Sequence, residues 1–163
     1  MLVSPLAPGD HGDRDGVLAI ADAAEMSVDV DAELARSFAL LWVARPNAGH
    51  APTAFLLAWA VADELHLIHI ATHPAARRKG AARALMAALI DRATEHKCRL
   101  VLLEVRRSNR SAIRLYRAMG FSAMGVRRGY YTDGEDAVEM MLTLDPMTGA
   151  VRPGRDEVEL LGA

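Results

Sequence analysis

Apolar residues recur along the chain with two different periods, and the alternation between them predicts an α/β fold. Short alternating or continuous apolar runs predict strands, whereas apolar residues three and four positions apart predict helices. The expected strands cover residues 1–7, 38–45, 53–61, 65–72, 99–105, 121–131 and 135–144. The expected helices cover residues 13–25, 30–37, 80–96 and 110–118.

The order of these elements predicts one domain with a mixed, mostly antiparallel sheet flanked by about four helices. The strand–helix–strand unit over 65–105 requires a parallel strand pair with a right-handed crossover. The run at 99–105 is almost wholly apolar, which predicts a strand buried on both faces. Thr132-Asp133-Gly134 is typical of a hairpin turn between the last two strands. We expect this domain to cover 1–145 and a loosely ordered tail to cover 146–163.

Length and composition limit the classes of protein that fit. A chain of 163 residues suits one domain, and its single cysteine, Cys98, excludes an intramolecular disulfide and argues against a Cys-based metal site. The histidines lack metal-binding spacing, so no metal is expected. The sequence has neither a membrane-length apolar run nor a signal-peptide pattern. We therefore expect a cytoplasmic protein with no membrane partner.

Basic residues are concentrated in the middle of the chain. Residues 77–128 hold 14 basic and 3 acidic residues, a net charge of +11, whereas the rest of the chain carries −13. This asymmetry favours a polyanionic ligand at the central region. The arginines are spread over loops, helices and strands without interleaved aromatic residues, so direct nucleic-acid binding is not expected.

Residues 77–82, RRKGAA, lie between a predicted strand and a predicted helix. A helix N-terminus offers unpaired amides and a partial positive charge, and small residues let a pyrophosphate approach the backbone. Taken alone, the hexapeptide fits a phosphate-binding loop or a solvated basic turn equally well.

Three other side chains have a structural and a functional interpretation each. Glu104, near the end of an apolar strand, is either neutralised by an arginine or has a raised pKa and acts as a base. Tyr116 is either a core aromatic residue or a functional phenol. His69 is either an ordinary core histidine or a proton relay near Glu104.

Together these segments resemble the GCN5-related N-acetyltransferase superfamily, and more closely its RimI-type N-terminal acetyltransferases. The superfamily loop [Q/R]-x-x-G-x-[G/A] is matched by Arg77-x-x-Gly80-x-Ala82. The RimI-type resemblance extends over about 63–144. It rests on IATHP at 70–74, LEVR at 103–106, SNxxAIxLY at 108–116, GF at 120–121, RRxYY at 127–131 and EDA at 135–137.

The resemblance implies acetyl-CoA as the donor and assigns roles to particular residues. Glu104 corresponds to the general base and Tyr116 to the general acid that protonates the leaving thiolate and also contacts the donor. Tyr130 and Tyr131 correspond to tyrosines at the entrance for the acceptor. The implied donor-binding residues are Ile70, Ala71, Thr72, Arg77, Arg78, Lys79, Gly80, Ala81, Ala82 and Asn109.

The implied acceptor is a protein N-terminal α-amine, in the family the alanine N-terminus of a small-subunit ribosomal protein. The family's Pro-Trp-Ser motif between the first two helices is absent, because residues 25–31 read EMSVDVD. A lysine side chain or a small amine therefore stays open as the alternative acceptor. Residues 22–33 contain five acids and no cation, and we expect Asp29 and Asp31 to favour a basic residue soon after the acceptor's first position.

Overall fold

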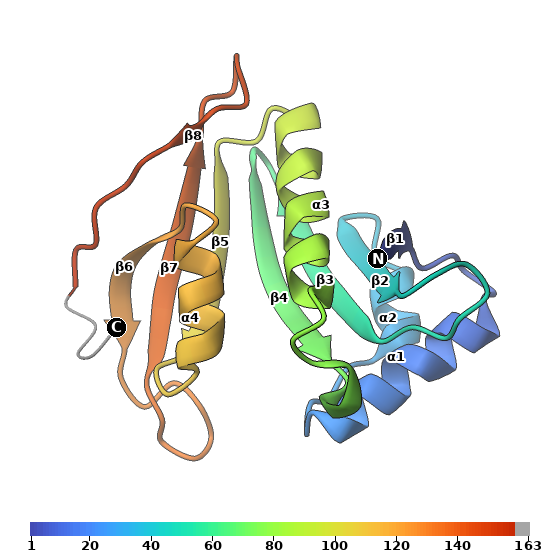
Figure 1. Ribbon diagram of the computed structural model, residues 1–163. Helices are drawn as coiled ribbons and strands as arrows, with labels where there is room; N and C mark the ends of the chain where they lie inside the picture. The colour runs from blue at the N-terminus through green and yellow to red at the C-terminus, as the bar shows by residue number, and fades with distance from the viewer. Residues whose placement is uncertain (159–163) are drawn as a thin grey trace. The chain divides into compact units, whose positions relative to one another are not determined.

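The computed structural model describes residues 1–158 and confirms the predicted α/β fold class. These residues form eight strands and four α-helices in a mixed, mostly antiparallel arrangement (Figure 1). The chain divides into two compact units, one of residues 1–60 and 67–91 and the other of residues 61–66 and 92–163.

The first unit pairs its strands in the order β1-β2-β3-β4. It contains β1 (Leu2–Pro5), α1 (His11–Ala23), α2 (Val30–Leu34), β2 (Ala39–Arg45), β3 (Ala54–Val61), most of β4 (Glu64–Thr72), the 3₁₀ turn η1 (Pro74–Ala76) and most of α3 (Ala81–Glu95). The β1–β2 and β2–β3 pairs are antiparallel, with Leu2 opposite Arg45 and Ala39 opposite Trp59.

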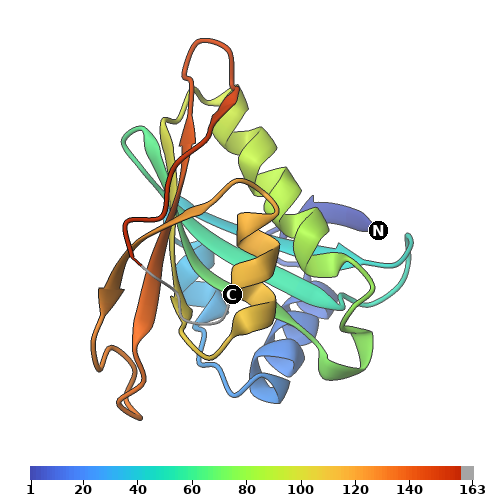
Figure 2. The same ribbon diagram turned by 60° about the vertical axis from the view of Figure 1, so that its left-hand side comes forward.

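The core of the first unit lies between α1 and strands β2 and β3. Val17 and Ile20 of α1 are fully buried together with Val43 of β2 and Phe55 of β3. Figure 2 shows α1 and α2 running along the same side of these strands. Gly16 allows α1 to approach closely, because a Cβ there would lie 2.9 Å from the Pro52 side chain.

The second unit pairs its strands in the order β5-β7-β6, with β8 added to β7. It contains β5 (Leu100–Arg106), α4 (Arg110–Arg117), β6 (Ser122–Arg127), β7 (Ala137–Leu144) and β8 (Val151–Arg152). All of these pairs are antiparallel, and β6 is irregular between Ala123 and Gly125. The fixed β5–β7 register places Glu104 directly opposite Glu139.

Two details of this unit differ from the sequence prediction. The strand at 99–105 was expected to be buried on both faces, but in β5 only Val101, Leu103 and Val105 are buried, and Glu104 on the other face is exposed. The turn expected at Thr132-Asp133-Gly134 is present, with the Gly134 amide donating to the Tyr131 carbonyl at 2.8 Å, but the predicted strand 121–131 ends at Arg127, so the turn lies within a wider loop over 128–136. The physical reason is that the Asp136 carboxylate accepts the Gly129 amide, at 3.0 Å, in place of a strand partner.

The predicted tail after residue 145 contains β8 in its described part. Val151 lies opposite Leu144, and the Asp156 carboxylate pairs with Arg117 and accepts the Ala123 amide at 2.8 Å. Residues 159–163 of that predicted tail lie outside the described residues. The boundary between domain and tail at residue 145 stays a prediction.

Candidate active site

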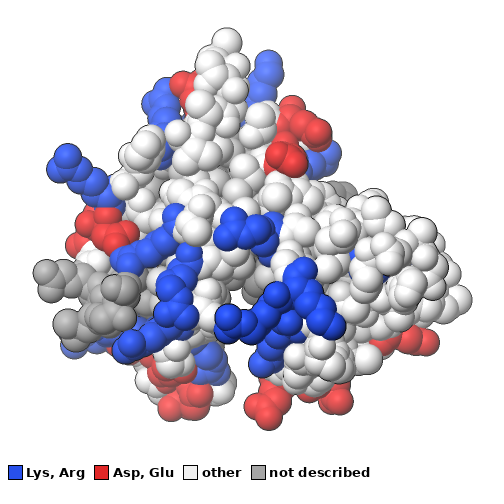
Figure 3. All heavy atoms as spheres, in the orientation of Figure 1, with Lys and Arg blue, Asp and Glu red and all other residues white. Residues whose placement is uncertain are grey.

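The basic loop at 77–82 lies in the first unit, between the end of β4 and the start of α3. Arg78 has a φ of +62° and Gly80 a φ of +87°, so the backbone turns sharply before α3 begins at Ala81. The Arg77 side chain reaches back to the Thr72 carbonyl, at 3.5 Å. Residues 77–80 are exposed, and Figure 3 shows Lys and Arg side chains gathered around the loop that precedes α3.

This loop has the properties that bind a phosphate group. The first amides of α3 have no partner within the helix and carry its partial positive charge. A Cβ built on Gly80 would meet no atom within 4 Å, so the backbone is open on that side. The preceding β4 residues Ile70, Ala71 and Thr72 alternate in burial, with only Ala71 buried. The predicted donor-binding residues therefore lie at the end of strand β4 and in the loop before α3, with η1 between them.

Glu104 projects from β5 in the second unit, with 34% of its side chain exposed. Its Oε1 lies 3.7 Å from Nη2 of Arg127 on β6, and the Arg127 Nε donates to Glu139 at 2.6 Å. Arg127 therefore pairs with two carboxylates, those of Glu104 on β5 and Glu139 on β7. Arg127 is thus the arginine that pairs with Glu104, and the role of Glu104 as a base stays a prediction.

Tyr116 lies on the inner side of α4 and is 4% exposed. Its ring packs against Phe121 with a centroid distance of 5.8 Å. Burial raises the pKa of Tyr116, and the nearby Tyr131 raises it further. The phenol therefore keeps its proton through the physiological range, so the structural and the functional interpretation of Tyr116 both fit its place.

Asn109 begins α4 as its N-cap. Its side-chain oxygen accepts the Ala112 amide at 3.1 Å and the Ser111 hydroxyl at 3.1 Å, so it caps the helix. Gly120 follows the helix with a φ of +96°, a conformation typical of the glycine that ends a helix. Figure 3 also shows basic side chains over α4.

Tyr130 and Tyr131 lie in the 128–136 loop of the second unit, not on a strand as the sequence predicted. Their rings meet edge to face with centroids 5.2 Å apart, and Tyr130 is 47% exposed. Burial raises the pKa of Tyr131, and the negative charge of Glu104 adds to this effect. Glu104, Tyr116 and Tyr131 thus share one electrostatic neighbourhood in the second unit.

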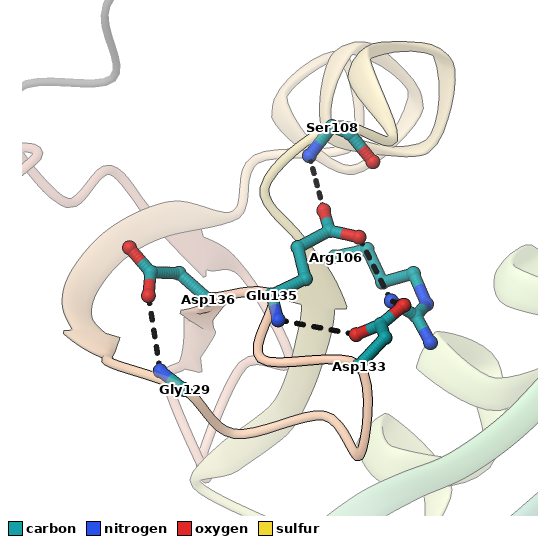
Figure 4. A network of polar contacts seen from close by, with 6 residues as sticks. All are labelled: Arg106, Ser108, Gly129, Asp133, Glu135 and Asp136. Atoms are coloured by element: carbon teal, nitrogen blue, oxygen red, sulfur yellow. Dashed lines mark hydrogen bonds and ion pairs between the residues drawn. The ribbon is translucent and has the colours of Figure 1, made fainter.

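A polar network fixes this loop to the end of β5, and none of its members is among the site residues predicted from the sequence (Figure 4). Arg106 Nη1 contacts Asp133 and Glu135, each at 2.8 Å. Glu135 also accepts the Ser108 amide at 2.8 Å, and these contacts with Ser108 and Arg106 lower its pKa to about 2. The EDA segment at 135–137 was noted as part of the resemblance, but nothing local to it indicated Arg106 as its partner.

The predicted acceptor-binding acids lie around α2 in the first unit, where both have structural partners. The Asp29 side chain caps α2 by accepting the Ala32 amide at 3.0 Å. Asp31 forms a two-pronged ion pair with Arg14, at 2.9 and 2.6 Å. Both remain exposed, so their proposed role toward an acceptor stays a prediction.

The remaining candidates from the sequence have ordinary surroundings. Burial lowers the pKa of His69, while Glu33 opposes this shift. Cys98 is buried, and burial raises the pKa of its thiol. Among residues 1–158, no three His, Cys, Asp or Glu side chains come together in a way that could hold a metal ion. No helix in that part of the chain is long and apolar enough to cross a bilayer.

Comparisons with known proteins agree with the motifs. The model of the acetyltransferase (GNAT) family matches residues 19–121. The [ribosomal protein bS18]-alanine N-acetyltransferase of Escherichia coli K12 is 44% identical over 94 residues, which cover 56% of this chain and 64% of that protein. An N-alpha-acetyltransferase of Saccharolobus solfataricus is 41% identical over 76 residues, covering 46% of each. The matched part thus spans less than two thirds of these curated relatives.

A solved structure extends the similarity over more of the chain. The crystal structure of the ribosomal-protein-S18-alanine N-acetyltransferase from Escherichia coli superposes with a TM-score of 0.77 at 32% identity. The match covers 88% of this chain and 94% of that structure. The family model covers more than half of the chain, including the basic loop, Glu104 and Tyr116. The chain belongs to the acetyltransferase (GNAT) family.

Proposed function

We propose that this protein is an acetyl-CoA-dependent N-acetyltransferase that acetylates the α-amine of a protein N-terminus in the cytoplasm. The observation that carries the proposal is its 32% identity to the Escherichia coli S18-alanine N-acetyltransferase over 94% of that structure. The natural acceptor is then the alanine N-terminus of a ribosomal protein of the bS18 type. Neither a metal nor direct contact with nucleic acid is part of this proposal.

The loop before α3 is proposed to hold the donor. Its exposed cations and the free amides at the start of α3 suit a pyrophosphate, and the open side of Gly80 leaves the backbone accessible. Residues of β4 and Asn109 would bind other parts of the donor. The proposed donor-binding set is Ile70, Ala71, Thr72, Arg77, Arg78, Lys79, Gly80, Ala81, Ala82, Asn109 and Tyr116. Acetyl-CoA would supply the thioester that is cleaved.

Glu104 is proposed as the general base and Tyr116 as the general acid. An acceptor α-amine has a pKa of about 7.7–8.0, so a large part of it is protonated at neutral pH and must lose a proton before it can attack. The exposed Glu104 carboxylate would accept that proton directly or through water. The Tyr116 phenol, which keeps its proton because it is buried, would give that proton to the departing thiolate.

The choice of an α-amine over a lysine amine rests on the same chemistry. A lysine amine has a pKa of about 10.4, so a carboxylate base frees an α-amine far more readily at neutral pH. Tyr130 and Tyr131 are proposed to contact the first residues of the acceptor, and Asp29 and Asp31 to attract a basic residue that follows. The alternative is a lysine or small-amine acceptor.

The test is steady-state acetylation of peptides with a free alanyl N-terminus, compared with a lysine peptide whose backbone amine is blocked. Glu104→Gln and Tyr116→Phe should each lower kcat by about 10²–10⁴-fold, the usual contribution of a general base or acid. Glu139→Gln is the matched control, because Glu139 binds the same arginine, and it should keep most of the activity. Equal rates with the lysine peptide would replace the N-terminal proposal by the alternative, and near-normal turnover in Glu104→Gln and Tyr116→Phe would refute their roles.

A further inference from the structure

We propose that Arg106 is a positioning residue for the acceptor: anchored by Asp133 and Glu135, it holds the ring of Tyr131 and thereby sets the affinity for the acceptor. This inference rests on the proposed function, in which Tyr131 contacts the acceptor. It concerns a residue that the resemblance includes only as part of the LEVR segment at 103–106.

The position of Arg106 places its charge on the same face of β5 as the proposed base. Side chains two residues apart on a strand point to the same side, so Arg106 follows Glu104 on the exposed face. The Arg106 guanidinium carbon lies 4.0 Å from the centroid of the Tyr131 ring. This distance is well within the range of a cation–π contact. The Arg106 charge also lowers the pKa of Tyr131, opposing the effect of burial.

The guanidinium is anchored on its other side, so that it cannot follow the ring freely. Both Asp133 and Glu135 bind the same nitrogen, Nη1, at 2.8 Å. Glu135 is itself held by the Ser108 amide at 2.8 Å. Figure 4 shows these groups beside the end of β5, with the loop running from Gly129 past Asp133 to Glu135.

The backbone of the loop is tied down by further bonds. The Glu135 amide donates to Asp133 at 3.1 Å, and the Tyr131 amide donates to the Glu135 carbonyl at 3.1 Å. At the base of the loop, the Arg107 amide donates to the Asp136 carbonyl at 3.0 Å. The Arg106 side chain thus links the hydrogen-bonded 128–136 loop to the Tyr131 ring.

The magnitudes favour a role in positioning over a role in overall stability. The side chains of Arg106 and Asp133 are 39% and 58% exposed, and ion pairs at such exposure contribute little to the stability of a fold. The ring contact restricts where Tyr131 sits within a loop that is otherwise fixed by its backbone. Loss of that contact should therefore loosen Tyr131 while the protein stays folded.

The experiment is a double-mutant cycle on Arg106 and Tyr131, with the acceptor peptide varied at saturating acetyl-CoA. Arg106→Lys keeps the charge but loses the planar, forked group. It should raise the acceptor KM by roughly three- to fivefold, as expected for an exposed cation–π contact, with kcat and the KM for acetyl-CoA little changed. Because Arg106 acts through Tyr131, Arg106→Lys should add almost nothing to the effect of Tyr131→Leu. The matched control is Arg99→Lys, which alters the ion pair with Asp63 just before β5.

An unchanged acceptor KM in Arg106→Lys, or effects that simply add in the double variant, would overturn the proposal. If the wild-type protein acetylates no N-terminal peptide, the proposed function fails, and a second readout still tests the anchoring. Trypsin should cleave after Arg128 several times faster in Glu135→Gln than in wild type, because that variant loses one of the two anchors of Arg106. Equal cleavage rates would refute the anchoring by itself.

Discussion

Substitutions at Gly80 test how closely the donor approaches the backbone just before α3. Its φ of +87° lies in the left-handed region, where an L side chain costs about 1–2 kcal/mol. A Cβ at this position would meet no protein atom within 4 Å, so Gly80→Ala introduces backbone strain without a clash. The whole effect of the substitution on the free protein therefore comes from φ.

The loop can either keep its strained shape or relax, and the two cases change different measured quantities. If the loop keeps its shape, the free energy of unfolding falls by about 1–2 kcal/mol and acetyl-CoA affinity changes little. If the loop relaxes, binding must restore its shape, and the same 1–2 kcal/mol weakens acetyl-CoA binding by about 5- to 30-fold. We expect the second outcome, because residues 77–80 are exposed.

Two further variants separate strain from direct contact with the donor. Gly80→Asn tolerates the left-handed conformation better, so it should bind acetyl-CoA more tightly than Gly80→Ala if strain is the cause. Equal losses in both would instead indicate that any side chain obstructs the pyrophosphate. Gly134→Ala is the matched control, because Gly134 has a φ of +84° and is equally open but lies in the 128–136 loop. It should leave acetyl-CoA affinity unchanged.

The assays are isothermal titration with acetyl-CoA and chemical denaturation of the free protein, both at constant salt. Gly80→Ala with wild-type stability and wild-type affinity would refute the reasoning, because the strain would then have no consequence at all. A loss of affinity in Gly134→Ala as large as in Gly80→Ala would also refute it, because the effect would not belong to the donor loop.

Two other predictions concern stability. Asp13 on α1 is buried and pairs with Arg45 at the end of β2, so Asp13→Asn should lower the free energy of unfolding by roughly 3 kcal/mol in urea denaturation. Asp31 belongs to an exposed ion pair, so Asp31→Asn should have a much smaller effect. Equal effects of the two substitutions would show that burial of the Asp13 pair does not matter. The pKa of Glu135 is lowered to about 2, so its carboxylate stabilises the folded protein at pH values above the ordinary pKa of a glutamate. The difference in stability between wild type and Glu135→Gln should therefore be present at pH 7 and shrink as the pH falls from about 4.5 toward 2. A difference that does not vary with pH would contradict the assignment.

The order of elements was predictable from the sequence because each element has its own local pattern. The helical spacing of Leu85 and Leu89 predicts the buried side of α3, and both residues are fully buried. The two ends of α4 could also be predicted locally, because Asn109 is a favoured residue before a helix and Gly120 a favoured residue after one. These features depend on neighbours within a turn or two of the chain.

The parts that the sequence could not predict depend on residues far apart along the chain. Arg106 and Glu135 are separated by 29 positions, and their contact requires the β5–β7 register to be known first. The exposed side of β5 was missed because an apolar run does not say how much of each face its neighbours cover. The 128–136 loop was missed because side chains such as Asp136 replace strand hydrogen bonds there, which a turn motif does not reveal.

The acidic segment 22–33 shows how structural partners change an inference from charge alone. The Glu33 carboxylate accepts the Trp59 indole N–H at 2.8 Å and pairs with Arg36 at 3.3 Å, and Asp31 pairs with Arg14. Two of the five acids in this segment are therefore neutralised within the first unit. Among the described residues, Asp29 forms no ion pair, and its carboxylate accepts only the helix-capping amide bond. Since Asp31 is paired with Arg14 and Asp29 is not paired with a cation in the described part of the chain, any preference of this segment for a basic acceptor should depend more on Asp29 than on Asp31.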